Sequence, residues 1–460
     1  MNTPKHIAVI DIGKTNAKLA LVDLASMSEI AVLTRPNTVL PGPPWPHFDT
    51  EGHWEFLLLA LAQFHRDHGV DAISITTHGA SVVLLDAQGG LAAPILDYEH
   101  DGPASVTAAY DAIRPDFDDT GSPRLANGLN VGAQLHWQFH VDPALRGRTA
   151  HVLTYPQYWG QRLTGEIACD VTSIGCHTDL WKPGAGTFSD LIHTLDIADK
   201  MAPVRQSTDI LGTLLAQVAI ATGLRPDTPV SCGIHDSNAS LFPHLVTQSG
   251  AFSVVSTGTW VIAMSIGGAE IRLDPARDTL MNVNAYGDAV PSARFMGGRE
   301  FEIVQQGKPV QIHPEHVESV LESDLLLLPA IVPTTGPYKG ANMRWRGPEP
   351  AVGSGERAVA LSFYLALVTA RCLRLIGAKG PTIVEGPFAE NRQYLAMLQA
   401  ATGRTVMHSA SATGTSIGAA LLVHSAQNLE TPTSFEPDDA LPRLQNYAAG
   451  WQRAAQVGSV

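Results

Sequence analysis

Asp236 is the residue whose position best suits acid–base chemistry. It follows His235 after a glycine turn, a few residues beyond a predicted short strand at 229–230. A carboxylate at such a strand end can accept the proton of a hydroxyl that attacks a phosphate. The alternative is a helix N-cap, because Asp is favoured there and Ser237 stands beside it. Both interpretations can hold together.

A second carboxylate, Asp11, ends the predicted strand 7–10 and opens a turn of small and charged residues. It could hold Mg²⁺ directly or through water, or it could satisfy turn amides instead. Small residues let backbone N–H groups approach a phosphate, and two lysines add positive charge. The alternative for the turn is a plain β-turn with exposed lysines. The residues after Asp11 are Ile12, Gly13, Lys14, Thr15, Asn16, Ala17 and Lys18.

Three other motif matches are rejected. A Walker loop needs a glycine five positions before Gly13, and Ala8 stands there. The G-x-G-x-x-A match at 353–358 follows a proline-rich segment instead of a strand, so it predicts a turn into a helix. The cysteines near His177 lack the spacing of a zinc site.

A strand, a glycine turn and a second strand occur twice in the chain. The apolar runs 252–255 and 260–265 flank Ser256-Thr257-Gly258-Thr259, which repeats the first turn about 245 positions later. This repetition predicts a duplicated domain. We place the boundary between residues 236 and 250, which gives domains at 1–240 and 241–460.

The remaining elements alternate between strands and helices, which predicts the α/β class. An amphipathic helix begins after Asp49, and a buried strand at 72–76 follows it. In the second half, a largely buried helix is expected at 356–376. The other expected elements are strands at 82–85 and 382–385, and helices at 391–401 and 415–422.

Composition excludes several classes of protein. The chain has 460 residues and a net charge of −14, so it lacks the basic character that nucleic-acid binding requires. Its four cysteines are too few for a disulfide scaffold. No secretory signal opens the sequence, and the apolar stretch 358–370 is too short to span a bilayer. We therefore expect a cytoplasmic protein with no membrane partner.

Taken together, the motifs resemble the FGGY family of carbohydrate kinases, within the actin/hexokinase/Hsp70 superfamily. The resemblance runs over nearly the whole chain and depends on the order of six segments. They are Asp11–Lys18, Tyr158–Asp170, Gly233–Asp236, Ser256–Trp260, Glu385–Asn391 and Thr413–Leu422. It implies two actin-like, ribonuclease H-like α/β domains with a cleft between them.

The resemblance also implies a nucleotide site that binds ATP and Mg²⁺. Asp11 would organise the metal ion. The two glycine turns would surround the β- and γ-phosphates through Gly13, Lys14, Thr15, Asn16, Lys18, Gly258 and Thr259. Gln305, Gly386 and Asn391 would contact the nucleotide. The adenosine turn is usually richer in glycine than here, where Pro387 and Phe388 intervene, so nucleotide preference is left open.

On the sugar side, the resemblance implies that Asp236 is the catalytic base. The residues expected to bind the sugar are His78, Gly79, Asp97, Tyr98, Glu99, His235 and Asp236. Relatives commonly carry an arginine near the position of Glu99. An acid there would accept hydrogen bonds from sugar hydroxyls instead of donating them, so the sugar is expected to differ from xylulose.

We therefore expect an ATP-dependent kinase that phosphorylates a hydroxyl of a ketose in carbohydrate catabolism. Local sequence favours the rhamnulokinase and fuculokinase branch, with an L-rhamnulose- or L-fuculose-like substrate. The alternatives within the family are kinases for xylulose, ribulose, glycerol or erythritol. Alternatives of another class are an actin-like ATPase scaffold and a sugar sensor. The expected partner is a small-molecule sugar, and a homodimer is left open.

Overall fold

The computed structural model describes residues 4–308, 310–409, 414–424, 429, 431–436 and 441–456. The chain forms two compact units. The first comprises Met1–Thr247, Met281–Ala289 and Thr413–Glu430, and the second comprises Gln248–Leu280, Val290–Ala412 and Thr431–Val460. The first unit thus includes two segments from the second half of the chain.

The first unit is built around a mixed sheet in the order β13-β14-β6-β1-β2-β3, with β15 also paired to β6. β1 is antiparallel to β2 and parallel to β6. The strands are β1 (His6–Ile12), β2 (Asn16–Asp23), β3 (Ser28–Pro36), β6 (Ala72–Thr77), β13 (Ile210–Thr213), β14 (Pro229–Ser231) and β15 (Ile234–His235). The predicted strand–turn–strand unit at the start of the chain is confirmed.

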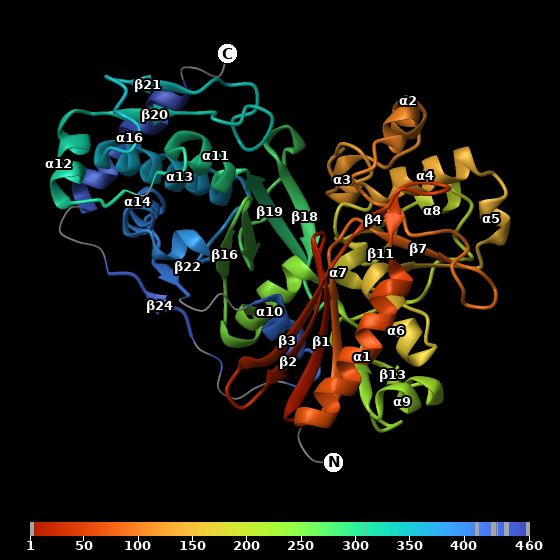
Figure 1. The fold of residues 1–460 in the computed structure, drawn as a ribbon. Helices are drawn as coiled ribbons and strands as arrows, with labels where there is room; N and C mark the ends of the chain where they lie inside the picture. The colour runs from red at the N-terminus through yellow and green to blue at the C-terminus, as the bar shows by residue number, and fades with distance from the viewer. Residues whose placement is uncertain are drawn as a thin grey trace. The chain divides into compact units, whose positions relative to one another are not determined.

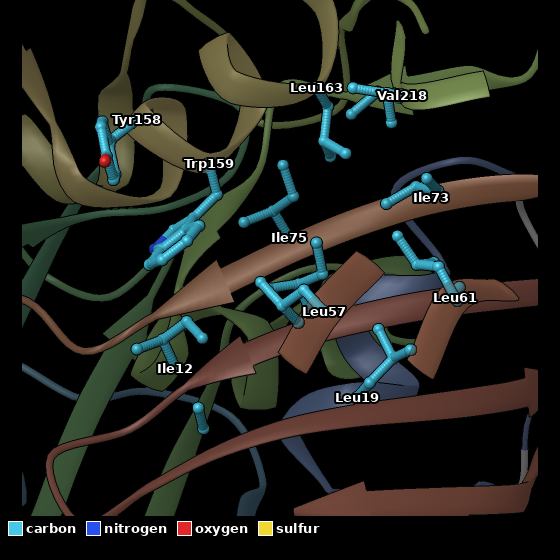
Figure 2. Close-up of a cluster of buried hydrophobic side chains, with 14 of the residues drawn as sticks. Ile12, Leu19, Leu57, Leu61, Ile73, Ile75, Tyr158, Trp159, Leu163 and Val218 are labelled. Atoms are coloured by element: carbon cyan, nitrogen blue, oxygen red, sulfur yellow. The ribbon is translucent and has the colours of Figure 1, made fainter. Parts of the chain in front are cut away.

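Helices α1 (Thr50–His68) and α6 (Tyr155–Thr164) pack against this sheet. Asp49 caps α1 by accepting from the backbone N–H of Gly52, as its sequence predicts. Apolar residues of both helices meet those of β1, β2 and β6 in one buried cluster (Figure 2). Its labelled members include Ile12, Leu19, Leu57, Leu61, Ile73, Ile75 and Trp159.

On the other face of the sheet lie α10 (Asp236–Thr247) and α15 (Thr415–Ala420). α15 comes from the far end of the sequence, yet Ser74 Oγ of β6 donates to the carbonyl of Ala419 over 2.6 Å. A side chain on Gly418 would lie 1.8 Å from the carbonyl oxygen of Ala239. A glycine is therefore required where these two helices touch. Thr413, the first residue of the closing segment expected from the sequence, lies outside the described residues.

Smaller elements complete the first unit, several of them around a second apolar cluster. The helices are α2 (Thr107–Asp111), α3 (Phe117–Thr120), α4 (Val131–Val141), α5 (Leu145–Arg148), α7 (Val171–Ile174), α8 (Leu191–Thr194), α9 (Ala216–Thr222) and the 3₁₀ turn η1 (Gly102–Val106). The strands are β4 (Val39–Leu40), β5 (His47–Phe48), β7 (Val82–Leu85), β8 (His151–Thr154), β9 (Cys169–Asp170), β10 (Trp181–Lys182), β11 (Thr187–Phe188) and β12 (Val204–Arg205).

A second sheet has the order β18-β19-β17-β16-β22-β23-β24. Most of it belongs to the second unit, although residues 281–283 of β18 are assigned to the first, and Figure 1 labels β16, β18, β19, β22 and β24. The strands of this sheet are β16 (Phe252–Thr257), β17 (Val261–Ile266), β18 (Thr279–Val283), β19 (Ala289–Phe295), β22 (Thr382–Glu385), β23 (Val406–His408) and β24 (Thr433–Ser434). The remaining elements are α11 (Gly297–Gln305), α12 (Pro314–Glu322), α13 (Gly355–Leu375), α14 (Arg392–Thr402), α16 (Leu441–Gln456), β20 (Leu326–Leu328), β21 (Arg344–Arg346) and the 3₁₀ turns η2 (Pro275–Arg277) and η3 (Pro387–Glu390).

The two sheets repeat one pattern of pairing. β16 is antiparallel to β17 and parallel to β22, as β1 is antiparallel to β2 and parallel to β6. A further parallel strand follows in each sheet, because β23 pairs with β22 as β14 pairs with β6. The duplication predicted from the two glycine turns is therefore present in the strand topology.

Helix α13 is the long apolar helix that the sequence predicts. Among the described residues it is the one helix that is long and apolar enough to cross a membrane. Of its most apolar 18-residue stretch, 83% is buried inside the structure. Such burial is typical of the core helix of a globular fold.

Candidate active site

The turn between β1 and β2 is closed by backbone and side-chain hydrogen bonds. The N–H of Gly13 donates to the carbonyl of Asn16 over 2.9 Å. Asn37 donates its side-chain N–H to the carbonyl of Gly13 over 2.8 Å, and buried His53 contacts Asn37 Oδ1 over 2.7 Å. Burial lowers the pKa of His53 to about 4. Asn37 and His53 thus brace the turn, and nothing in their local sequence predicted this role.

Asp11 lies opposite Lys18 in the β1–β2 ladder. Lys18 Nζ is 3.2 Å from Asp11 Oδ2 and also 3.2 Å from Glu29 Oε1. Burial raises the pKa of Asp11, and the charge of Asp236 acts in the same direction against the opposing effect of Lys18. Asp11 and Asp236 are thus close enough to interact electrostatically.

Asp236 is the first residue of α10, directly after β15. Its Oδ1 accepts from the backbone N–H of Ser237 over 2.6 Å and lies 3.2 Å from His235 Nε2. β15 runs parallel to β6, with His235 opposite Thr77. The carboxylate therefore stands where a strand becomes a helix, which is compatible with both roles that the sequence suggested.

Cys176 contacts the imidazole beside this carboxylate. Its buried thiol is close enough to the rings of His177 and His235 for both to act on it electrostatically. Burial alone would raise the pKa of Cys176, but the two imidazoles outweigh it and bring the pKa to about 5. For His235, burial is outweighed by Cys176 and Asp236, which raise its pKa to about 9. Nothing in the local sequence predicted this cluster, because the spacing of these cysteines only argued against a zinc site.

His78 follows β6 and is surrounded by aromatic rings. Its ring centroid lies 5.1 Å from those of Phe48, Tyr98 and Tyr155. Nδ1 bonds the carbonyl of Gly79 over 2.9 Å, whereas Nε2 is buried and has no hydrogen-bond partner among the described residues. Burial lowers the pKa of His78 to about 4, so the ring is neutral at pH 7. This nitrogen thus has a hydrogen-bonding capacity that the described residues do not use.

Gly79 allows His235 to pack closely beside His78. A side chain on Gly79 would lie 2.7 Å from His235 Nε2, the nitrogen that faces Asp236. Asp236 also acts electrostatically on both His78 and Tyr98. The structure thus brings the predicted base and three of the predicted sugar-binding residues together.

Lys14 belongs to the same group of side chains. Its ammonium forms an ion pair with Asp97 and lies 3.2 Å from Glu99 Oε2. It also lies 4.8 Å from the ring centroid of Tyr98. Lys14 therefore joins the turn expected to bind phosphate to the segment expected to bind sugar.

In the second unit, two glycines allow close packing beside the β16–β17 turn. Gly386 has φ of +78°, and a side chain there would lie 2.0 Å from the carbonyl oxygen of Thr257. A side chain on Gly298 would lie 2.1 Å from the carbonyl oxygen of Gly258. Gly258 and Thr259 are thus packed against the start of α11. The sequence analysis singled out Gly386 but missed Gly298.

A pocket of about 530 Å³ lies between α11, α13 and the start of α14. Gln305 and Asn391, both expected to contact nucleotide, line it together with Phe301, Gly307, Lys308, Val310, Ile312, Ala358 and Ser362. Gln305 donates to the carbonyl of Lys308 over 2.9 Å, and its Oε1 is buried without a partner among the described residues. Asn391 donates to Ser362 Oγ over 3.0 Å and accepts from the N–H of Tyr394 over 3.0 Å.

Glu300 anchors the helix that carries Phe301 and Gln305 into this pocket. Its buried carboxylate accepts from the N–H of Val332 over 3.1 Å and from the hydroxyl of Tyr364 over 3.0 Å. Burial raises the pKa of Glu300 to about 7. The residue lies in the segment MGGREFE, yet its sequence suggested no such role.

The described residues contain no group of three or more His, Cys, Asp or Glu side chains arranged to hold a metal ion. Mg²⁺ bound with a nucleotide commonly uses one or two protein carboxylates, with phosphate oxygens and waters as its other ligands. Asp11 can supply one such carboxylate, and the negative charge of Asp236 acts on it as well.

Comparison with known proteins assigns the chain to a family. The model described as "FGGY family of carbohydrate kinases, N-terminal domain" matches residues 6–243, and "Carbohydrate kinase FGGY, C-terminal domain" matches residues 249–432. The chain belongs to the FGGY family of carbohydrate kinases. The family and fold predicted from the six ordered segments are confirmed.

A crystal structure of a carbohydrate kinase from Novosphingobium aromaticivorans is 34% identical, covers 100% of both chains and superposes with a TM-score of 0.92. Among curated relatives, an L-fuculokinase from Salmonella typhi is 25% identical over 56% of this chain and 56% of its own length. An L-xylulose/3-keto-L-gulonate kinase from Escherichia coli (strain K12) is 25% identical over 56% of this chain and 53% of its own length. The chain thus matches little more than half the length of these curated relatives.

Proposed function

We propose that the protein is an ATP-dependent kinase that phosphorylates a hydroxyl of a ketose. The observation that carries this proposal is that Asp236 lies 3.2 Å from His235, whose ring packs against Gly79 beside His78, and that its charge acts on Asp11. The residues expected to act as base, to organise metal and to bind sugar therefore meet within the first unit.

In the proposed reaction, Asp236 accepts the proton of the acceptor hydroxyl. As that proton leaves, the hydroxyl oxygen forms a bond to the γ-phosphorus, and the bond from this phosphorus to the oxygen that bridges it to the β-phosphate breaks. The products are a sugar phosphate and ADP. His235 and Ser237 both contact Oδ1 of Asp236. Its Oδ2 is thus the oxygen for which no contact is described, and we assign it the proton transfer.

Backbone amides near Gly13 in the first unit, and backbone amides near Gly258 in the second unit, would each bind phosphate oxygens. Asp11 would hold Mg²⁺, which when bound neutralises charge that develops on the phosphoryl group. Lys18 contacts Asp11 and would add positive charge at this position. Lys14 is already paired with acidic side chains, so of the residues predicted to contact phosphate it is the least suited to that role.

Adenosine would occupy the pocket lined by Gln305 and Asn391. A volume of about 530 Å³ suits a ligand of this size. The unpartnered Oε1 of Gln305 can accept from the exocyclic amine of adenine, which guanine does not offer at the same position. Gly386 would keep the turn that is expected to contact adenosine close to the β16–β17 turn, which is expected to bind phosphate.

For the sugar, we propose a ketose of the L-rhamnulose or L-fuculose type, acting in cytoplasmic carbohydrate catabolism. The similarity to an L-fuculokinase supports this choice. Kinases for xylulose, ribulose, glycerol or erythritol are the alternatives within the family. An actin-like ATPase would release ADP without regard to sugar.

The test is ADP release from ATP and Mg²⁺ across a panel of ketoses, aldoses and polyols. We expect release that depends on one class of ketose and is lost in Asp236→Asn. Equal ADP release with and without sugar would instead support the ATPase alternative. ADP release that survives in Asp236→Asn would contradict the role of the base.

A further inference from the structure

Every cation described around the expected sugar-binding residues is already paired with acid. Lys14 is paired with both Asp97 and Glu99. His235, the second cation, faces Asp236 across 3.2 Å. Each positive charge is thus balanced or outnumbered by its own neighbours.

The same holds at the edge of the group. Lys18 lies 3.2 Å from both Asp11 and Glu29. His78 contributes no charge at pH 7, because burial lowers its pKa to about 4. A carboxylate on the substrate would therefore meet only cations that already face one or two acidic side chains.

Hydroxyl groups suit these side chains far better. A sugar hydroxyl both donates and accepts, so it can accept from Lys14 while donating to Asp97 or Glu99. The ring of Tyr98 is partly exposed and supplies an apolar face for C–H groups. Nε2 of His78, whose ring lies beside that of Tyr98, is buried and unpaired among the described residues. The side chain of Glu99 is 60% exposed, whereas that of Asp97 is 11% exposed. One carboxylate is therefore open to solvent and the other is largely enclosed.

We propose that Lys14, Asp97 and Glu99 form a specificity-determining cluster that selects an uncharged polyhydroxy sugar over a sugar acid. This inference rests on the proposed function, because it concerns the acceptor of that same reaction. It also assigns Lys14 to the acceptor sugar instead of to phosphate.

The experiment compares matched acceptors with the full-length protein. Neutral ketoses and polyols are paired with aldonates and ketoaldonates of the same carbon number, and kcat/KM is measured by ADP release. We expect the best neutral acceptor to exceed its matched acid by at least about tenfold, because like charges repel at short range. A wild-type preference for the acid would overturn the proposal.

Two variants test the cluster itself. Glu99→Gln and Asp97→Asn each remove one acid from Lys14, so each should move the ratio of neutral to acidic kcat/KM toward the acid by about tenfold. Lys14→Met should lower kcat/KM for the neutral sugar while changing the KM for ATP less than about twofold. The surface change Asp190→Asn, which breaks only an exposed pair with Lys182, is the control. Unchanged ratios in folded Glu99 and Asp97 variants would contradict the proposal.

A binding measurement separates this inference from the proposed function. If no acceptor supports ADP release, calorimetry with the same neutral and acidic compounds still measures preference. Tighter binding of the neutral compound would support the proposed specificity of the cluster, even though the proposed kinase reaction had failed. Tighter binding of the acid would overturn the cluster whatever the reaction is. Thermal unfolding of each variant shows whether it is folded.

Discussion

The imidazole Nε2 of His235 lies 3.2 Å from Oδ1 of Asp236 and would be met by any side chain placed on Gly79. His235 is therefore fixed between the proposed base and the segment that carries His78. Cys176 also acts electrostatically on this ring and raises its pKa. A carboxylate positioned from one side in this way keeps its other oxygen for proton transfer.

Asp236→Asn should lower kcat by about 10²–10⁴-fold, roughly 3–5 kcal/mol of barrier. The change keeps the shape of the side chain but removes the base. ATP affinity should change little. Because Asn caps helices nearly as well as Asp, the thermal midpoint should also stay close to wild type. A folded variant with near-normal turnover would show that Asp236 serves only the start of α10.

Gly258→Val should weaken ATP binding by roughly tenfold or more without unfolding the protein. The nearest atom to a side chain on Gly258 would be 3.9 Å away, so the fold has room for one. The added methyl groups would instead block approach of a phosphate to the turn amides. Gly298→Ala provides the contrast, because its side chain would clash with the carbonyl of Gly258 and should destabilise the fold. Normal ATP binding by calorimetry in Gly258→Val would refute the phosphate role.

His78→Ala should raise the KM for the sugar by more than about tenfold and the KM for ATP much less. The reason is the buried Nε2, which has no partner among the described residues and is free for a substrate hydroxyl. Steady-state kinetics with each substrate varied in turn makes the comparison. Equal increases in both KM values would mean that His78 only fills space among Phe48, Tyr98 and Tyr155.

Glu300→Gln should make stability less dependent on pH. The folded state raises the pKa of Glu300 from 4.5 to about 7, so it holds a proton that the unfolded chain has released. The stabilisation is complete below about pH 4.5 and is lost as pH rises through 7, a change of roughly 3 kcal/mol. Thermal midpoints of the wild type should therefore fall between pH 5 and about 8 more steeply than those of the variant. Parallel curves would show that Glu300 does not titrate in this range.

Local sequence was sufficient for elements whose pattern is complete within a short segment. The β1–β2 and β16–β17 turns, the Asp49 cap of α1 and the buried helix α13 follow from alternation, capping chemistry and helical periodicity. The order of the six motifs was sufficient for the family, because each constrains a different part of the same fold.

Contacts between distant segments could not be predicted in this way. Lys14 meets Asp97 across 83 positions, and Cys176 meets His235 only because α7 and β15 pack together. No periodicity within either segment records its partner. The charge balance of the candidate sugar site depends on these contacts, so it became visible only in three dimensions.

The position of α15 has a consequence for synthesis on the ribosome. The face of the first sheet beside Ile7, Val9 and Ala72 is covered partly by Ile417, Ala419 and Ala420. A nascent chain that ends at Thr247 has all seven strands of that sheet and α10, but it leaves the part of this apolar face that α15 covers exposed. The first unit therefore cannot finish folding before most of the second has been translated, and chaperones have a defined surface to protect during that interval.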